Sequence, residues 1–330
     1  MVHIQCLQTI QDAAGNQKGE IMTRKNTGNV INKKEFQFRD RLIKGIEAEG
    51  RFKVSVVKTT EVVRTAQLNH NLSLLNTLLL GRTLTVSMLL ASELKGEERI
   101  RVTLEGSGPV GLIVAEANRA GEVRGYVNNP GAELDYSDDD VKIGDGIGIG
   151  LLTVSKTLYN EAEPQVSSIE IVKGDIQSDI AHYMVQSEQV LSAIKLDVSL
   201  NEDGTVKQAG GLLIQRLPGA DPEMMETLEE TLAELPPVSE LLSGDEYIDE
   251  IMVKASAPFR VKKLDRLPVH FFCRCSTDNF KNALALLSYE DLKGMQDEDQ
   301  EMVCHFCSKK HKISKEEMLQ IAETVRARMN

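Results

Sequence analysis

The feature that most constrains this chain is a set of four cysteines near its C-terminal end. They form two close pairs, Cys273 with Cys275 and Cys304 with Cys307, and twenty-eight residues separate the pairs. Each pair can hold one side of a tetrahedral metal ion, and four thiolates are a ligand set of structural zinc sites, which keep no open position. Two such close pairs are not expected of unrelated buried cysteines. The pattern therefore predicts one Zn²⁺ per chain, bound by all four sulfurs in the reduced protein.

Two histidines lie close enough in the sequence to compete as ligands. His270 precedes the first cysteine pair, and His305 lies inside the second pair. Because four sulfurs already complete a tetrahedral shell, we expect both histidines to be bystanders. The fifth cysteine, Cys6, lies alone in a polar stretch, and we expect it to take no part in the chemistry of the other four.

Composition narrows the possible partners. The net charge is -12, from 50 acidic and 38 basic residues, whereas binding of nucleic-acid phosphates needs a basic surface. With no Trp and only 4% aromatic residues, platforms for base stacking are also scarce. No run of about eighteen apolar residues occurs, so we expect no membrane span. Residues 1–32 lack the apolar region of a secretory signal, so we expect a cytoplasmic protein with reduced thiols.

Changes in composition divide the chain into four parts. Residues 1–38 are polar and rich in Asn, Lys and Gln, which is typical of a poorly ordered arm. Residues 39–220 contain the strand and helix signals of a body that can form a real core. Residues 221–266 form an acidic, amphipathic linker. Residues 267–330 contain the four cysteines and are expected to form a small zinc-binding module.

The body is predicted to be α+β, with mostly antiparallel strands and buried helices. Residues 72–94 are apolar on nearly all faces of a helix, which indicates a buried helix. Another helix should begin at Glu61, with Thr59 or Thr60 as its cap. Runs with β-branched residues between turn signals predict the strands. The expected strands are residues 40–46, 51–58, 99–105, 111–117, 122–127, 150–156, 166–172, 194–200 and 206–215, and a further helix is expected at residues 175–186.

A glycine-rich stretch in the body could suggest a nucleotide site. Residues 106–111 match G-x-G-x-x-G, but the last glycine begins the strand-like run Leu112–Val114, where a dinucleotide site needs a helix. Pro109 also lacks the N–H that a phosphate cradle would use. We therefore interpret residues 106–111 as a hairpin turn.

The linker combines a strong negative charge with one apolar helical face. Between Asp221 and Glu250 there are eleven acidic residues and no Lys or Arg. Such a run repels itself, so the linker should be marginally stable unless its apolar face docks on the body. Pro236-Pro237 should end the first helix. The apolar face contains Met224, Leu228, Leu232 and Leu235.

The cysteine module has few large apolar side chains and can form only a small core. Helices are expected near residues 280–287 and at residues 289–295. Ser314 and Glu317 form a capping box before a last helix. Bound zinc would therefore have to supply much of the folding energy, roughly 10–16 kcal/mol for structural sites in small peptides.

Several motifs resemble those of the redox-regulated heat-shock protein 33 family. Both cysteine pairs lie in such motifs, which are HFFCRCS at residues 270–276 and VCHFC at residues 303–307. The resemblance extends from about Asp40 to the C-terminus and leaves residues 1–38 outside. Similar motifs in the body are Glu105–Pro109, Glu122–Pro130, Ser187–Val190 and Ala209–Gly211.

The resemblance implies a stress-response chaperone that holds unfolding proteins, and not an enzyme. It implies that the reduced, zinc-bound form is inactive, and that oxidants produce the disulfides Cys273–Cys275 and Cys304–Cys307, release zinc and loosen the C-terminal half. The oxidised form would bind unfolded or partly folded client proteins and tend to form a homodimer. The candidates for client binding are Met224, Leu228, Leu232 and Leu235, or the body surface that they cover.

Two other functions are compatible with the sequence. The zinc module could be an adaptor that binds a protein or nucleic acid while reduced, and it would then be basic with exposed aromatic side chains. The body could be an enzyme, but its two histidines, His70 and His182, lie near no recognisable nucleophile motif. Suppression of protein aggregation by reduced and by peroxide-treated samples would separate the three functions.

Overall fold

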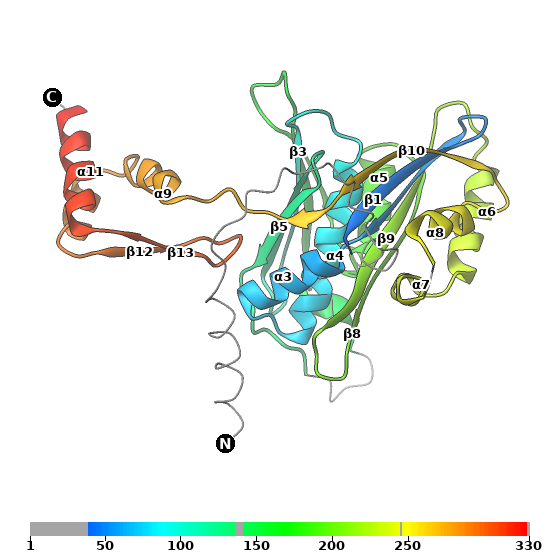
Figure 1. Ribbon diagram of the computed structural model, residues 1–330, viewed down its shortest axis with the longest axis horizontal. Helices are drawn as coiled ribbons and strands as arrows, with labels where there is room; N and C mark the ends of the chain where they lie inside the picture. The colour runs from blue at the N-terminus through cyan, green and yellow to red at the C-terminus, as the bar shows by residue number, and fades with distance from the viewer. Residues whose placement is uncertain (1–38, 136–140, 245, 329–330) are drawn as a thin grey trace, which may run out of the picture. The chain divides into compact units, whose positions relative to one another are not determined.

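The computed structural model describes residues 39–135, 141–244 and 246–328, and the body consists of two β-sheets with helices between and around them (Figure 1). The polar arm expected at residues 1–38, with Cys6, lies outside these residues. The first sheet contains, in spatial order, β10 (Val261–Pro268), β1 (Arg41–Glu47), β2 (Phe52–Lys58), β9 (Val206–Arg216) and β8 (Ser192–Leu200).

The second sheet has six strands in the part of the chain that the structure describes. Among the described strands, all paired neighbours run antiparallel except β11, which runs parallel to β5. The fold is therefore α+β with antiparallel sheets, as predicted. In spatial order, the second sheet contains β11 (His270–Phe271), β5 (Glu122–Val127), β4 (Leu112–Asn118), β3 (Arg99–Gly106), β6 (Gly150–Thr157) and β7 (Gln165–Glu170).

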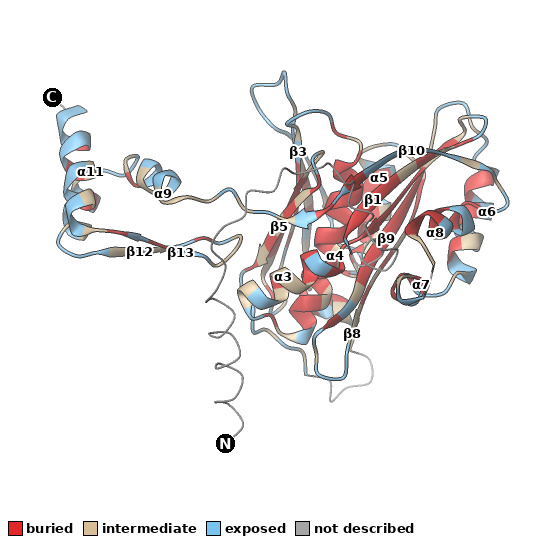
Figure 2. Cartoon of the chain, in the orientation of Figure 1, coloured by how far each residue is buried: buried red, intermediate tan, exposed pale blue. Residues whose placement is uncertain are grey.

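Helix α4 (Leu74–Ala91) forms the centre of the body, since it contacts strands of both sheets (Figure 2). The Ser73 hydroxyl begins the helix by accepting a hydrogen bond from the Asn76 N–H. Its length and composition would suit a membrane span, but 83% of this window is buried inside the protein. The predicted buried helix is thus a core helix. Around it lie α3 (Thr60–His70), α5 (Gln177–Gln186) and the short helix η1 (Ile143–Gly146).

The three linker helices cover the other face of the first sheet. They are α6 (Glu223–Glu234), α7 (Val238–Ser243) and α8 (Ile248–Ala255). Leu42 packs in the core around α4, whereas its neighbour Ile43 packs with the linker helices, because alternate strand residues point to opposite faces. The expected docking of the apolar linker face on the body is confirmed. Met224, Leu228 and Leu232 are buried in this second core, and Leu235 is partly buried against it.

The cysteine module contains short elements around a small core, as its composition predicted. The Ser276 and Ser288 hydroxyls each accept a hydrogen bond from the N–H three residues on, which explains where two of its helices begin. The predicted capping box is confirmed, since Ser314 and Glu317 each accept from the other's N–H. The elements are α9 (Thr277–Leu284), α10 (Tyr289–Met295), β12 (Gln300–Val303), β13 (Lys310–Ile313) and α11 (Lys315–Arg328).

Three details differ from the sequence prediction. The side chain of Thr59 does not cap α3, because Oδ2 of the Asp40 carboxyl group accepts the Val62 N–H at 2.8 Å instead. Strand β7 ends at Glu170, since the Asp179 carboxylate accepts three N–H groups of the following turn, at residues 172–174. The strands β10, β11, β12 and β13 were not predicted. The glycine-rich residues 106–111 form the predicted turn between two antiparallel strands, β3 and β4.

Candidate functional site

Four thiols from two separate loops meet in the cysteine module. Cys273 and Cys275 follow β11, whereas Cys304 and Cys307 lie between β12 and β13. All four Sγ atoms lie within 4.8 Å of one another, and the described cysteines form no disulfide. The Sγ atoms are 3.6 Å apart for Cys273 and Cys304, and 3.5 Å apart for Cys275 and Cys307. Corners of a tetrahedron with metal–sulfur bonds of about 2.3 Å are about 3.8 Å apart, so the geometry fits one metal ion.

Main-chain hydrogen bonds place both cysteine loops. On the body side, the His270 N–H donates to Gly121 and the Phe272 N–H donates to Val123, so β11 brings Cys273 to the edge of β5. In the second loop, the Cys304 N–H donates to the Lys309 carbonyl at 3.0 Å, which closes a tight turn. This turn places Cys304 and Cys307 on the same side of the loop.

Of the histidines near the cysteines, His270 and His305 pack against aromatic rings, whereas His311 lies next to a cysteine sulfur. The His270 ring packs against Phe272, and the His305 ring packs against Tyr126. Among the described residues, the only cluster of potential metal ligands consists of the four cysteines. The buried His311 was missed from the sequence, although its Nε2 lies 3.3 Å from Cys275 Sγ. The only signal in the sequence is the alternation of Lys310, His311, Lys312 and Ile313, which places His311 on the same face as Ile313 if this segment is a strand.

The thiols differ in their electrostatic environments. Burial alone would raise the pKa of Cys273, but hydrogen bonds from the Cys275 N–H, the neighbouring thiols and Arg124 together hold this pKa below its ordinary value. Burial and the neighbouring sulfurs raise the pKa of Cys275. The surroundings of Cys273 therefore favour the thiolate, the form that binds metals and reacts with oxidants.

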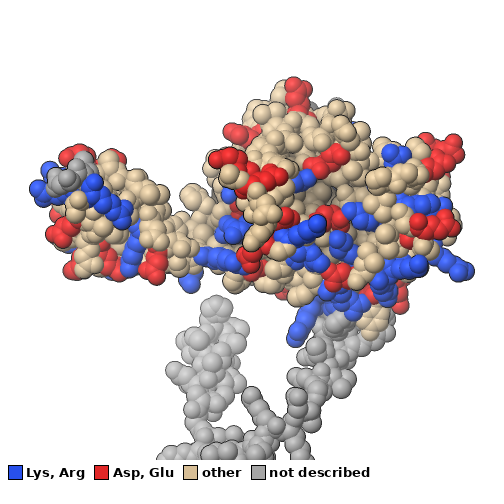
Figure 3. Space-filling model, turned by 90° about the horizontal axis from the view of Figure 1, so that it is seen from above, with Lys and Arg blue, Asp and Glu red and all other residues tan. Residues whose placement is uncertain are grey.

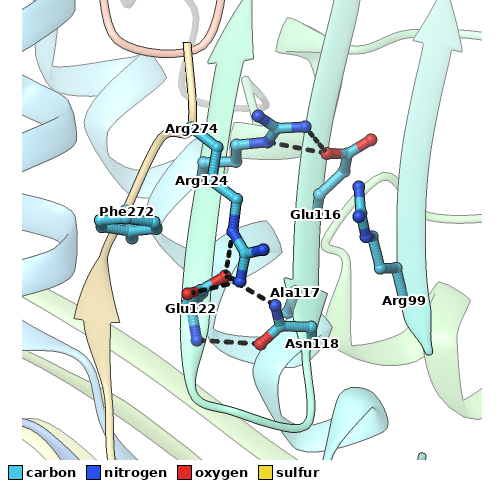
Figure 4. A pocket seen from close by; sticks show the side chains of 8 residues that line it. All are labelled: Arg99, Glu116, Ala117, Asn118, Glu122, Arg124, Phe272 and Arg274. Carbon is cyan, nitrogen blue, oxygen red and sulfur yellow. Dashed lines mark hydrogen bonds and ion pairs between the residues drawn. The ribbon is translucent and has the colours of Figure 1, made fainter. Parts of the chain in front are cut away.

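Arg124 on β5 connects the cysteines to the body sheet. Its Nη1 lies 3.7 Å from Cys273 Sγ, and its Nε donates to Glu116 Oε2 on β4 at 2.8 Å. The guanidinium carbon also lies 4.0 Å from the centre of the Phe306 ring. Figure 4 shows Arg124 with Glu116, and next to them Arg274 with Glu122, around a small cavity of about 50 Å³. Carboxylates of the sheet thus fix two arginines. Glu116 holds Arg124 of the body, and Glu122 holds Arg274 of the first cysteine loop.

The buried carboxylate of Glu116 has a second basic partner. Arg101 on β3 donates from its Nε to Glu116 Oε1 at 2.7 Å. Burial would raise the pKa of Glu116, but the hydrogen bonds from Arg101 and Arg124 hold it below its ordinary value. Glu116 is therefore ionised and orients both guanidinium groups, of which only that of Arg124 contacts a cysteine.

The second cysteine loop docks on the body through Phe306. The Phe306 ring lies perpendicular to that of Tyr126 on β5, with 5.2 Å between the ring centres. Its carbonyl oxygen lies 3.0 Å from His70 Nε2 on α3, and the Ser308 hydroxyl lies 2.9 Å from His70 Nδ1. Three body residues, His70, Arg124 and Tyr126, therefore contact the loop between Cys304 and Ser308.

Three comparisons with known proteins find similarity to the same protein family. A model of the Hsp33 protein family matches residues 40–314. A 33 kDa chaperonin of Bacillus velezensis is 38% identical over 293 residues, which are 86% of this chain and 98% of that protein. A 33 kDa chaperonin of Bacillus subtilis is 36% identical over 288 residues, or 84% and 97% of the two chains. The crystal structure of a 33 kDa chaperonin, a heat shock protein 33 homolog from Thermotoga maritima, matches with a TM-score of 0.80 and 31% identity over 88% of this chain and 99% of that chain.

Proposed function

Because the chain belongs to the Hsp33 family, which is a family of chaperones and not of enzymes, we propose that it is a chaperone controlled by the redox state of its cysteines. In this proposal the reduced form is inactive, and the oxidised form binds unfolding proteins and prevents their aggregation. The single observation that carries the proposal is the meeting of four reduced thiols, from two loops, within 4.8 Å.

Zinc is the metal that this donor set favours. Cys273, Cys275, Cys304 and Cys307 would each supply one thiolate to one Zn²⁺ per chain in the reduced form. Four sulfur ligands and a closed tetrahedral geometry are typical of structural zinc. The small core of the cysteine module supports this assignment, because bound zinc would supply folding energy that the core lacks.

Oxidation by a peroxide would remove the sulfur ligands. Two thiolates give up two electrons and form one S–S bond, while one hydrogen peroxide takes these electrons and two protons and becomes two waters. Two such steps use all four thiolates. We propose the pairs Cys273–Cys275 and Cys304–Cys307 from the family resemblance. These disulfides join sulfurs within each loop, so the two loops would no longer be held together and zinc would be released.

Release of the cysteine module would destabilise the linker. We propose a body at residues 39–220, a linker at residues 221–266 and a redox module at residues 267–330. The end of the linker forms β10, which pairs with β1 and leads directly into β11 and Cys273. Linker and module therefore share one continuous segment, and loosening of the module would reduce the support of the acidic helices.

Linker release would expose the apolar surface that binds clients. Met224, Leu228, Leu232 and Leu235, or the sheet surface beneath them, are the proposed contacts with unfolded and partly folded proteins. We further propose that the active form is a homodimer and that the protein acts in the cytoplasm under oxidative stress, where its thiols are reduced in the resting state.

The test is suppression of aggregation of a heat-unfolded protein. Reduced, zinc-loaded protein should have little effect, whereas protein treated with peroxide should prevent aggregation. Equal activity in both states would contradict the redox control. An adaptor would instead bind its target while reduced. The face seen in Figure 3 gives no support to a nucleic-acid target, because acidic and basic side chains are mixed on it.

A further inference from the structure

Arg124 makes more contacts than its ion pair with the residue opposite it in the sheet. Arg124 and Glu116 lie directly opposite each other on β5 and β4, so their ion pair alone could be a cross-strand contact. Yet the same guanidinium also lies 3.7 Å from Cys273 Sγ and 4.0 Å from the centre of the Phe306 ring. Arg124 thus contacts both cysteine loops, one at a ligand sulfur and one at the residue between two ligands.

The charge of the cysteine centre depends on its redox state. Four thiolates and one Zn²⁺ have a net charge of −2, whereas two disulfides without the metal are neutral. Glu116 has two arginine partners, Arg101 and Arg124, so this group of three has a net charge of +1. A cation held next to the sulfurs therefore attracts the reduced centre and loses this attraction on oxidation.

We propose that Arg124 is a positioning residue that holds both reduced cysteine loops on the body sheet and releases them when oxidation removes the negative charge. This inference rests on the proposed zinc-bound, redox-controlled centre. In this arrangement Arg124 of the body responds to the charge of the cysteine centre through its contact with Cys273. The second loop contacts Arg124 through Phe306. His70 and Tyr126 complete the surface on which that loop docks.

The matched pair of variants is Arg124→Gln and Arg101→Gln. Both remove one arginine from Glu116, but only Arg124 contacts Cys273 and Phe306. In reduced, zinc-loaded full-length protein, Arg124→Gln should weaken zinc binding about tenfold in competition with a chelator, because loss of a partner of a metal ligand typically costs 10–100-fold in affinity. Arg101→Gln should stay within about twofold of the parent.

Hydrogen exchange tests the docking separately. In reduced protein, Arg124→Gln should raise the exchange of residues 270–275 and 304–309 about tenfold. After full oxidation, this difference between variant and parent should vanish, because the charge that Arg124 senses is gone. Because oxidation already releases both loops in the proposed mechanism, the comparison with Arg101→Gln in the reduced state is what separates the contact of Arg124 with the loops from a general loss of stability in the sheet. If Arg101→Gln has the same effect as Arg124→Gln, or if the difference persists after oxidation, the inference is wrong.

Phe306→Leu gives the same test without any change to the body sheet. It removes the ring that lies on Arg124 and Tyr126, and should speed zinc release and exchange of residues 304–309 in the reduced state. Parental values in this variant would also contradict the inference. These measurements use no client protein. A parent that fails the aggregation assay would therefore overturn the proposed function, whereas parental zinc affinity in Arg124→Gln would overturn only the role of Arg124.

Discussion

Lys195 on β8 donates a hydrogen bond from its ammonium group to the main-chain carbonyl of Leu235, 2.5 Å away. It donates to the Leu232 carbonyl at 2.6 Å as well, so it satisfies carbonyl groups at the C-terminal end of α6. Two residues along the same strand, the Asp197 carboxylate accepts the Ser239 N–H of α7 at 3.0 Å. A cation at a helix C-terminus and an anion at a helix N-terminus are both favourable, so β8 holds the linker on either side of Pro236-Pro237.

The first prediction concerns this attachment. Lys195→Met should raise hydrogen exchange in α6 and α7 of the reduced protein at least about tenfold, since a hydrogen bond to a charged group is worth roughly 1.5–3 kcal/mol. The control is Lys207→Met, at an exposed position on the neighbouring strand β9. Equal exchange in the Lys195 variant and the parent would show that the apolar face alone holds the linker.

The second prediction concerns the apolar face of α6. Leu228 is fully buried, and Leu228→Ala should cost about 2–5 kcal/mol of linker docking. The reduced, zinc-loaded variant should therefore suppress aggregation in part without any oxidant. Val253→Ala is the control, because Val253 lies in the linker helix α8 but is 53% exposed. A Leu228 variant that still needs peroxide for all of its activity would contradict the proposed release of the linker.

The third prediction concerns the metal. Replacement of any one of the four cysteines by serine should lower the zinc content of the purified reduced protein, because each sulfur supplies a quarter of the proposed ligand set. The four variants are Cys273→Ser, Cys275→Ser, Cys304→Ser and Cys307→Ser. Metal analysis of the four variants measures this directly. Full zinc content in both Cys304→Ser and Cys307→Ser would exclude a site of four sulfurs.

Cys6→Ser is the matched control for these variants. We expect it to keep full zinc content and normal activation by peroxide, since Cys6 lies in the polar arm outside the family match. If Cys6→Ser cannot be activated, the arm takes part in the redox switch and the proposed division of the chain is incomplete.

The fourth prediction concerns pH. Burial raises the pKa of Asp40 from 3.8 to about 8, although the hydrogen bond from the Val62 N–H and the charge of Lys58 lower it in part. Between these pKa values the folded state holds a proton that the unfolded state has lost. The stability that Asp40 contributes is therefore complete below about pH 4 and decreases as pH rises towards 8.

Asn mimics the neutral form of Asp40 and does not titrate. From pH 5 to pH 7, Asp40→Asn should gain about 1.4 kcal/mol of unfolding free energy relative to the parent for each pH unit. Denaturant titrations of both reduced proteins at three pH values give this difference. A difference that does not vary with pH would mean that Asp40 is ionised in the folded protein.

The features that could be predicted from the sequence are those with a local signal. Each cysteine pair, the apolar face of α6 and the Ser314–Glu317 capping box depend on spacing within one short segment, and the structure brings each set together. The buried helix α4 was likewise evident from its composition.

The features that could not be predicted depend on contacts between distant segments. Arg124 lies 149 residues before Cys273, and His70 lies 236 residues before Phe306. Strand β10 has mostly exposed residues, four of its eight residues are charged, and it lacks the alternation that indicates a strand, because it lies at the edge of its sheet and only β1 pairs with it. The predicted cap of α3 was wrong for the same reason. The residue that accepts the Val62 N–H is Asp40, which lies 22 residues earlier, just before β1.

The central claim is that oxidation of the four cysteines releases the linker while the body stays folded. Hydrogen exchange of reduced and peroxide-treated protein, with chaperone activity assayed on the same samples, tests it most directly. We expect protection to be lost from Asp221 to the C-terminus and kept in residues 99–127, which form β3, β4 and β5. If chaperone activity appears while residues 221–250 stay protected, client binding arises elsewhere and the proposed mechanism is wrong.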